Sequence, residues 1–472
     1  MSTRTPQPLR PGANPVGSRI PARPPAPPLL AHILTILLLA VALAAPFPGA
    51  AGTGEPAPGA PPPASGQLSL DFEESVRLAI RQSPYFTKSA IEIDLRRLDE
   101  TDSRYGLAPS INFHTLYYVN HPSRADINPK PYSLNFTTDP YNPFGAYFTL
   151  QAQKLATQMA ILVHLEAISQ GLQRLGVMFL ELDYLKRVAA CQANVMDLSR
   201  ENLTFCENRL AIGTGTSLEI QVAAQELQLA RNEQQQIAFT QRKVLANLRT
   251  FLGLKPDQEI AVDLKDLPRQ VLGTFDAATA SLAQAKSHSY ELKVLELKKQ
   301  LQGYNITLAK TKMLPRLVAN VQNPDPLSLT NVSGLYAGIG VEVPLWDGFK
   351  RLRDVSRQKT VLRQMNADKD LKEAELEDKW LSGQQDWLAA AGALKIARSQ
   401  EELAHLKERQ SEIRYHSGGE PLPVWLEGRK GVWQAKKSAA LKSLDSAKAA
   451  LALRQLSGDL GYSYVDANSW QK

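Results

Sequence analysis

The longest hydrophobic pattern in the chain is helical. Its apolar side chains recur at spacings of three and four: Leu155, Met159, Leu162, Leu165, Ile168, Leu172, Leu175, Phe179, Leu182, Leu185 and Val188. Such spacing places them on one face of an α-helix, and the pattern continues well beyond the length of an ordinary globular helix. Two proline-free stretches, 144–255 and 345–420, therefore predict very long helices.

Glycine-containing turns divide each stretch into two antiparallel arms. Gly213-Thr214-Gly215 ends the first descending arm as a left-handed cap, and Thr216 begins the returning helix. The second arm turns at 418–423. We expect descending arms of about 60 and 68 residues, roughly 90–100 Å, and returning arms of about 36 residues, roughly 54 Å. A further helix, at 70–107 or 276–313, would stack end-on above each short arm.

Four short segments alternate between apolar and polar side chains, which predicts β-strands at 111–120, 147–153, 317–322 and 335–345. The loops between paired strands, 121–145 and 323–334, are polar. Alternation over about ten residues is typical of a transmembrane β-barrel strand, and equally of a half-buried strand in a soluble sheet. Because four strands cannot close a barrel, a membrane-spanning sheet would require several protomers to pool their strands.

The chain reads as one structural unit written twice. The segments Arg209–Gly213 and Arg414–Gly418 stand at the same offset as Leu252-Gly253 and Ser457-Gly458, so the intervening stretches align without a gap. A period of about 205 residues is far too long for a solenoid repeat, so it indicates duplication of a whole structural half.

The first residues have the composition of an export signal. Four arginines and no acidic residue accompany an apolar run from Leu29 to Ala45, and small residues follow. The alternative, a membrane anchor, is disfavoured because a run of about 17 residues is short for spanning a bilayer, and cleavage after Ala51 is expected. The resulting division is a signal peptide at 1–51, a disordered spacer at 52–67, the first repeat at 68–268, the second repeat at 269–460 and a C-terminal tail at 461–472.

Charge and motifs exclude several functional classes. The formal charge of +7 falls to about +3 without the leader, which argues against nucleic acid as a partner. No nucleophile motif or phosphate-binding glycine loop is present in the sequence, and its histidines are scattered. We therefore expect no enzyme activity, no cofactor and no metal. Cys191 and Cys206 stand about 22 Å apart on one helix, too far for a disulfide, and are expected to be buried thiols.

Taken together, these residues resemble the TolC family of outer-membrane efflux channels, over about Leu68 to Leu460. The strongest element is the segment Val343-Pro344-Leu345-Trp346-Asp347-Gly348, which is similar to the family's turn from the last strand into the long helix. The family usually has a second glycine there, where this chain has Phe349. The segments ending at Gly213 and Gly418 resemble the family's hairpin tips.

The resemblance implies a mainly α fold with a β-barrel portion. Three chains would pool a 12-stranded outer-membrane β-barrel continuous with a 12-helix periplasmic α-barrel. The implied function is a passive exit duct of a tripartite efflux pump or type I secretion system, with a periplasmic adaptor and an inner-membrane pump as partners. Cargo stays open among small toxic molecules, metal ions and secreted proteins. The main rival interpretation is a soluble periplasmic coiled-coil adaptor or scaffold.

Acidic residues near the tips are candidates for a gate. Many members of the family carry carboxylates six and nine positions after the tip glycine. Glu219 lies six positions after Gly213, and Glu427 lies nine after Gly418, whereas Val424 departs from the pattern. Three copies of Glu427 would form a cation-attracting constriction. For Glu219 an ordinary role at the start of a helix is favoured, because carboxylates there are stabilised by the helix dipole.

The resemblance also assigns roles to other tip residues. We expect Tyr415 and Arg414 to hold the channel closed by bonding to a neighbouring hairpin. The residues expected to contact an adaptor are Gly213, Thr214, Gly215, Gly418, Gly419 and Glu420. Aromatic residues that could form girdles at the membrane interfaces are Tyr117, Tyr118, Tyr147, Phe148 and Tyr336.

Overall fold

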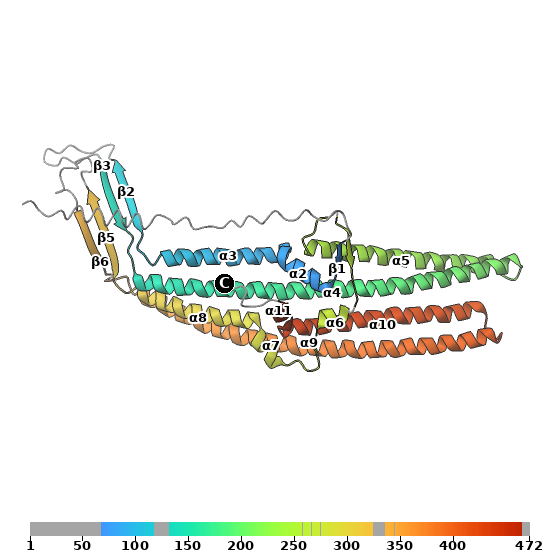
Figure 1. Cartoon of the computed structure of the whole chain (residues 1–472). Helices are drawn as coiled ribbons and strands as arrows, with labels where there is room; N and C mark the ends of the chain where they lie inside the picture. The colour runs from blue at the N-terminus through green and yellow to red at the C-terminus, as the bar shows by residue number, and fades with distance from the viewer. Residues whose placement is uncertain are drawn as a thin grey trace, which may run out of the picture. The chain divides into compact units, whose positions relative to one another are not determined.

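The computed structural model describes residues 68–117, 132–256, 258–265, 267–273, 275–323, 336–343 and 345–464. Two similar sets of elements follow one another along the described chain (Figure 1). The first set comprises β1 (Leu68–Leu70), α2 (Phe72–Gln82), α3 (Pro84–Tyr105), β2 (Ile111–Tyr117), β3 (Tyr132–Thr138), α4 (Pro143–Ala211) and α5 (Ser217–Phe251). The second comprises β4 (Ile260–Val262), α6 (Leu267–Leu272), α7 (Leu282–His288), α8 (Tyr290–Thr311), β5 (Arg316–Asn323), β6 (Tyr336–Glu342), α9 (Lys350–His416), α10 (Leu422–Leu456) and α11 (Asp459–Tyr464).

The two long helical hairpins predicted from the sequence are present. Helix α4 has 69 residues and α9 has 67, while the returning helices α5 and α10 have 35 each. Thr216 is the N-cap of α5, as expected, and its side chain accepts a hydrogen bond from the Glu219 N–H. Periodicity therefore predicted the arm lengths to within a few residues, except that α4 is longer than the expected 60.

The expected third helix above each short arm is confirmed, but it is broken into two in both repeats. α2 and α3 meet at Ser83, and α7 and α8 meet at Ser289; each serine caps the following helix. The breaks also join the stacked helices end to end. The Ser83 hydroxyl donates to the Phe251 carbonyl at the end of α5 at 2.6 Å. A Cβ added to Gly458, just past α10, would lie 2.6 Å from the Cβ of His288.

The helices of this unit pack in a fixed lateral order. Helices α3 and α5 contact α4; α4 also contacts α8 and α10; α9 contacts α8 and α10 (Figure 1). α4 thus has neighbours of its own chain on two sides, whereas α3, α5 and α9 occupy the two edges of the layer. The tips of both hairpins lie at the end of the helices away from the strands.

Four strands form an antiparallel sheet in the order β2-β3-β5-β6. Strands at three of the predicted positions are confirmed, but the prediction of a strand at 147–153 is wrong, because these residues belong to α4. Asn142 caps that helix by accepting from the Gly145 N–H at 3.1 Å, and Pro143 suits its first turn. The true partner strand, β3, lies within the segment predicted to be a loop at 121–145.

The sheet has one apolar row running across all four strands. Phe113 pairs with Phe136, Phe136 with Val321, and Val321 with Ala337. The next row is polar in three of its four positions and joins Asn112, Thr137, Asn320 and Gly338. Because directly opposed residues share a face of a sheet, one face is apolar and the other carries amides and hydroxyls.

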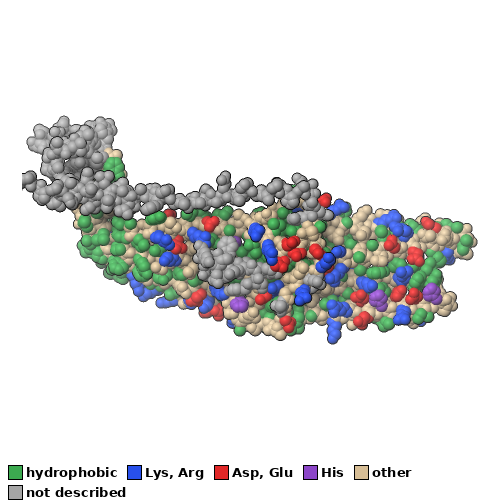
Figure 2. All heavy atoms as spheres, viewed as in Figure 1, with side chains coloured by type: hydrophobic (Ala, Val, Ile, Leu, Met, Phe, Trp, Pro, Cys, Tyr) green, Lys and Arg blue, Asp and Glu red, His purple; other side chains and the backbone are tan. Residues whose placement is uncertain are grey.

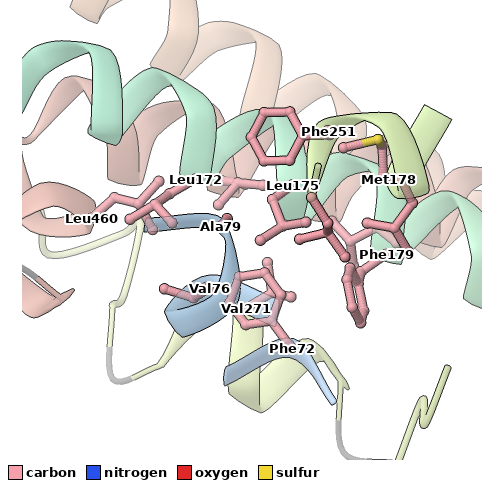
Figure 3. Packing of buried hydrophobic residues seen from close by; sticks show 14 of the residues in the cluster. Phe72, Val76, Ala79, Leu172, Leu175, Met178, Phe179, Phe251, Val271 and Leu460 are labelled. Carbon is pink, nitrogen blue, oxygen red and sulfur yellow. The ribbon is translucent and has the colours of Figure 1, made fainter. Parts of the chain in front are cut away.

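The main hydrophobic core lies where α2 and α6 pack against the middle of α4 (Figure 3). Phe72 and Phe179 are fully buried and meet edge to face with ring centroids 5.4 Å apart. Gly171 lies against α3, since a Cβ there would come within 2.4 Å of the Phe86 ring. Cys191 and Cys206 are free and buried, as predicted. Within the described ranges, no helix combines the length and apolarity needed to cross a membrane.

Candidate functional site at the helical tips

The first tip is a tight turn in which the Arg209 carbonyl accepts two backbone hydrogen bonds. α4 ends before Gly213, which has φ of 78° and so occupies the left-handed region. The N–H groups of Thr214 and Gly215 both donate to the Arg209 carbonyl, at 2.9 and 3.0 Å, and the Gly213 N–H donates to the Leu210 carbonyl at 3.0 Å. The bonds from Gly213 and Thr214 form a Schellman motif. A Cβ on Gly215 would lie 2.9 Å from the Leu210 backbone nitrogen, so the turn leaves no room for a side chain there.

The Arg209 side chain locks this turn to the next helix. Its guanidinium donates to the Thr214 carbonyl at 2.7 Å and to the Glu219 carboxylate at 3.3 Å. Glu219 lies in the first turn of α5. It is thus placed both as a helix-start carboxylate and as the partner of an arginine within its own hairpin.

The second tip repeats the backbone motif with a different side-chain lock. Gly418 has φ of 75°, and the N–H groups of Gly419 and Glu420 donate to the Arg414 carbonyl at 2.8 and 3.3 Å. The Arg414 guanidinium donates to Glu420 at 3.0 Å, and the Ser411 hydroxyl donates to the other oxygen of that carboxylate at 2.6 Å. The hydroxyl of Ser411, and then Arg414, hold the pKa of Glu420 below its ordinary value. The carboxylate therefore stays ionised and closes the turn.

An aromatic stack beside the second tip was not predicted from the sequence. The rings of Tyr415 and Trp425 lie parallel, with centroids 4.9 Å apart and an interplanar angle of 6°. Arg429 covers the Trp425 ring at 5.0 Å from its centroid. The stack links the end of α9 to the start of α10. A signal was present in the sequence, because an aromatic residue stands close to each side of the glycine turn.

The predicted gate residues lie near these tips and differ in whether they have a partner within the chain. Arg414 is engaged within its own turn, and the Tyr415 ring is engaged with Trp425. Glu427 is exposed on α10, and no hydrogen bond or ion pair in the described part of the chain involves it. Val424, at the position where the family often has a carboxylate, is also exposed.

A ladder of lysines on α10 joins the second hairpin to the first. Lys430, which is buried, reaches Glu226 on α5 at 2.8 Å. Further along α10, Lys437 contacts Gln192 on α4 and lies 3.5 Å from Glu233 on α5. Lys448 reaches Glu181 on α4 at 2.7 Å. These contacts place charged groups, rather than only apolar side chains, between the two hairpins along the length of α10.

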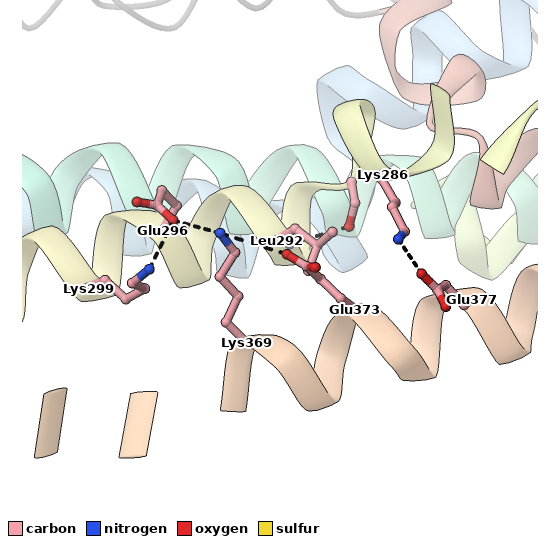
Figure 4. Close-up of polar contacts among 8 residues, drawn as sticks. Lys286, Leu292, Glu296, Lys299, Lys369, Glu373 and Glu377 are labelled. Atoms are coloured by element: carbon pink, nitrogen blue, oxygen red, sulfur yellow. Dashed lines mark hydrogen bonds and ion pairs between the residues drawn. The ribbon is translucent and has the colours of Figure 1, made fainter. Parts of the chain in front are cut away.

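A second ionic seam runs between α8 and α9 (Figure 4). Lys369 on α9 lies 3.1 Å from Glu296 on α8 and 3.7 Å from Glu373 one turn along its own helix. Lys299 also approaches Glu296, at 3.7 Å, and Lys286 of α7 pairs with Glu377. These side chains are partly exposed, so the seam is sensitive to salt.

The turn from the last strand into α9 has a strained backbone. Asp347 accepts a hydrogen bond from the Arg351 N–H at 3.2 Å, and Gly348 has φ of 64°. The next residue, Phe349, is also left-handed, with φ of 61° and ψ of 17°. Trp346 packs edge to face on Phe349 with centroids 5.0 Å apart. Pro344, also predicted as part of this turn, lies outside the described residues.

The aromatic residues predicted to form girdles do not all lie on strands. Tyr147 and Phe148 lie in the first turns of α4, while Tyr117 and Tyr336 lie at strand ends; Tyr118 is outside the described residues. Across the described ranges, no group of three or more histidine, cysteine, aspartate or glutamate side chains is placed to hold a metal ion.

Comparison with known proteins finds the likeness in structure. No protein-family model matches the chain, and no curated protein sequence matches it. The outer membrane protein VceC of Vibrio cholerae is 12% identical, with 82% of this chain and 96% of that chain covered and a TM-score of 0.67. The CmeC outer membrane channel of Campylobacter jejuni is 14% identical, with coverages of 84% and 88% and a TM-score of 0.67.

A third solved structure is the open state of the MtrE outer membrane channel of Neisseria gonorrhoeae. The two sequences are 12% identical, the alignment covers 82% of this chain and 88% of the MtrE chain, and the TM-score is 0.66. Each of these similarities covers at least four-fifths of the chain. The chain therefore has the fold of these outer-membrane channels.

Proposed function

We propose that this protein is one of three identical subunits of an outer-membrane duct through which another machine exports cargo. The observation that carries the proposal is that both edges of the single chain are open and apolar. When a subunit has two complementary edges, identical subunits can associate head to tail, so that each edge is covered by the next subunit and the ring closes.

The first helical edge carries an apolar stripe in heptad register. On α3 it consists of Ile91, Leu95, Leu98 and Tyr105, and on α5 of Leu218, Val222, Leu229 and Phe239, all exposed. Spacings of three, four and seven, and of ten between Leu229 and Phe239, keep these side chains on one face of each helix. Exposed heptad stripes are typical of a helix that packs against another helix.

The opposite edge, α9, carries a matching stripe. Its exposed members are Leu381, Leu388, Ile396, Leu403, Leu406 and Ile413. α9 has no neighbour in its own chain on this side, because its described contacts are with α7, α8 and α10. The α9 stripe of one subunit can therefore cover the α3 and α5 stripe of the next.

The sheet also has two open edges. β2 and β6 are edge strands of the four-stranded sheet, and open edges are not tolerated in the hydrocarbon of a membrane. Three sheets joined β6 to β2 would give a closed barrel of about twelve strands. The apolar row through Phe113 and Phe136 would then face lipid and the row through Asn112 and Thr137 would face the lumen.

The tips supply the proposed contacts with the rest of the machine. Their compact turns, at 213–215 and 418–420, are the proposed docking points for a periplasmic adaptor, which links the duct to an inner-membrane pump. Tyr415, Arg414 and Glu427 are the proposed gate, with Glu219 mainly holding its own turn through Arg209. If the Tyr415 hydroxyl bonds to a neighbouring hairpin, Tyr415→Phe raises the leak conductance; an unchanged leak would remove this residue from the gate.

Disulfide cross-linking between the two edges tests the ring. Leu229 and Leu403 lie at the same distance from their tips, since 229 is 16 positions after Gly213 and 403 is 15 before Gly418. In a variant with Cys191→Ala and Cys206→Ala, Leu229→Cys combined with Leu403→Cys should give covalent dimers and then trimers on oxidation. The ladder should end at three chains. Either cysteine alone should give no ladder.

A control moves both cysteines off the stripes, using Arg231→Cys with Arg398→Cys. Trimers from the stripe pair only, followed by channel conductance of the cross-linked trimer in a planar bilayer, would support the duct. A ladder that continues past three chains, or no ladder from the stripe pair, would contradict a closed ring of three.

A further inference from the structure

The four-stranded sheet carries very little charge. In the strands that the structure describes, the side chains that are charged or can gain a charge near neutral pH are His114, Arg316 and Glu342 only. Figure 2 shows the contrast with the helices: lysine, arginine and carboxylate side chains lie along them, whereas the end next to the strands is mostly hydrophobic. A single histidine can therefore change the charge of this part of the molecule substantially.

The strand register places His114 on the polar face of the sheet. His114 lies two positions after Asn112 on β2, so these two residues share a face, and Asn112 belongs to the polar row. His114 pairs with Asn135, which pairs in turn with Gln322. These partners are amides and carry no charge. His114 is exposed in the single chain, so its imidazole is open to whatever fills the space on this face.

The other charges of the polar face lie nearer the helices and largely cancel. Arg316 stands directly opposite Glu342 in register. Their row is separated from the row of His114 by about 20 Å along the strands. A further carboxylate, Asp139, follows β3; it accepts a hydrogen bond from the Ser110 hydroxyl at 2.8 Å and lies within electrostatic reach of His114. The described strand region therefore keeps one negative charge per chain while His114 is neutral, and none when it is protonated.

Strand β6 contributes two glycines to the same face. Gly338 pairs with Asn320, and Gly340 pairs with Val318. A Cβ added to Gly338 would have no atom within 4 Å, and one added to Gly340 would meet the Val318 carbonyl oxygen at 3.9 Å. Packing within the chain therefore does not require glycine at either position. The two glycines leave open space on the polar face, so a charge on His114 acts across that space.

The proposed ring brings three copies of His114 to one level of the barrel, because the polar face lines its lumen. Histidine changes its charge between about pH 5 and 8. Rings of charged side chains determine which ions a pore admits, and substitutions on the lumen side of a membrane barrel tune its selectivity. Three imidazolium groups would offset the negative charge that the three copies of Asp139 leave in the lumen.

We propose that His114 is a specificity-determining residue of the duct, and that its three copies let anions pass the barrel more readily in acid than at neutral pH. While the histidines are neutral, the carboxylates give the lumen a preference for cations. Once the histidines are protonated, that preference is lost and cargo bearing carboxylate or phosphate groups is admitted. The inference rests on the proposed function, because it takes three chains to form the barrel and the polar face to line it.

Planar-bilayer recording of the full-length chain tests the histidine ring. The reversal potential under a potassium chloride gradient gives the ratio of potassium to chloride permeability, measured at about pH 8 and about pH 5.5. For the wild type we expect this ratio to fall at least about twofold in acid. His114→Asn should remove most of the fall, while His405→Asn, at an exposed position on α9, should keep it. An equal fall in the wild type and in His114→Asn would overturn the proposal.

A second variant separates this inference from the proposed function. His114→Asp places a fixed negative charge at the same level, so the permeability ratio at about pH 8 should rise at least about twofold above that of the wild type. Channels whose ratio depends on neither substitution at residue 114 would leave the duct intact and remove the histidine ring. A wild-type chain that forms no channels would remove the duct itself, and the ring with it.

Discussion

The two long helices, α4 and α9, are copies of one another and yet are stabilised differently. α4 buries 22 of its residues, whereas α9 buries Val355, Trp380 and Ala397 only. α4 packs on helices of its own chain from two sides, and α9 from one. The contact between α9 and α8 includes several ion pairs, among them Lys369 with Glu296 and Lys312 with Asp354 (Figure 4). The position of each copy in the layer, central or edge, explains the difference better than its length or its place in the repeat does.

The comparison shows which part of the fold contributes most to its stability. The apolar core around α4 stabilises the single chain, whereas α9 leaves apolar side chains exposed that would meet another copy in the proposed ring. The two halves of the chain therefore share an architecture but differ in how much apolar surface they bury. The variants below probe this contrast in order of decreasing effect.

Removing a buried ring from α4 should have the largest effect. Phe179 has no exposed surface, so Phe179→Ala should lower the free energy of unfolding by about 3–5 kcal/mol. Glu296→Gln, which breaks the pair with Lys369 in the α8–α9 seam, should lower it by about 0.2–1 kcal/mol. Only the second loss should shrink in high salt. Urea unfolding followed by far-ultraviolet circular dichroism measures both; equal losses would contradict the contrast between the two helices.

Breaking the contact between the hairpins near their tips should have an intermediate effect. The Lys430 side chain is 9% exposed and lies 2.8 Å from Glu226, so Lys430→Ala should cost about 1.5–3 kcal/mol. The cost should appear as faster hydrogen exchange at the start of α10. Lys442→Ala is the matched control, because Lys442 pairs with Asp445 on its own helix surface and should cost less than about 0.5 kcal/mol. Identical exchange in the two variants would mean that Lys430 does not hold the hairpins together.

Acid should loosen the second tip with a smaller and local effect. The hydroxyl of Ser411 and the guanidinium of Arg414 hold the pKa of Glu420 below its ordinary value of 4.5. Its contribution is therefore complete above that ordinary value and is lost as pH falls through the lower folded value. Hydrogen exchange at residues 418–420, corrected for the intrinsic rate, should rise in this range. Glu420→Gln should abolish the response; a response that persists would place its cause elsewhere.

The sequence predicted the helical architecture because its signals are local. Apolar spacing along α4 and the glycines at 213 and 418 were sufficient to predict both hairpins and their tips. The pairing of β3 was missed for a physical reason. Phe148, Leu150 and Ala152 alternate as in a strand, but the same residues suit a helix, and the cap made by Asn142 with Pro143 decides between the two.

The side-chain locks at the tips could be predicted only in part. Thr216 and Glu219 follow a capping pattern that is visible in the sequence. The stack of Tyr415 on Trp425 depends on the register between α9 and α10 across the turn, and the contact of Lys430 with Glu226 joins residues 204 positions apart. Neither register is encoded by periodicity within one helix, so both required the structure.

The central claim is that three chains with open edges close into one membrane duct. Extraction of the membrane fraction in mild detergent, followed by native mass spectrometry, tests it most directly. The account predicts a complex of three chains, each beginning near Gly52, that requires detergent to stay in solution. A monomer or dimer recovered without detergent would contradict it, and would favour a soluble periplasmic scaffold instead.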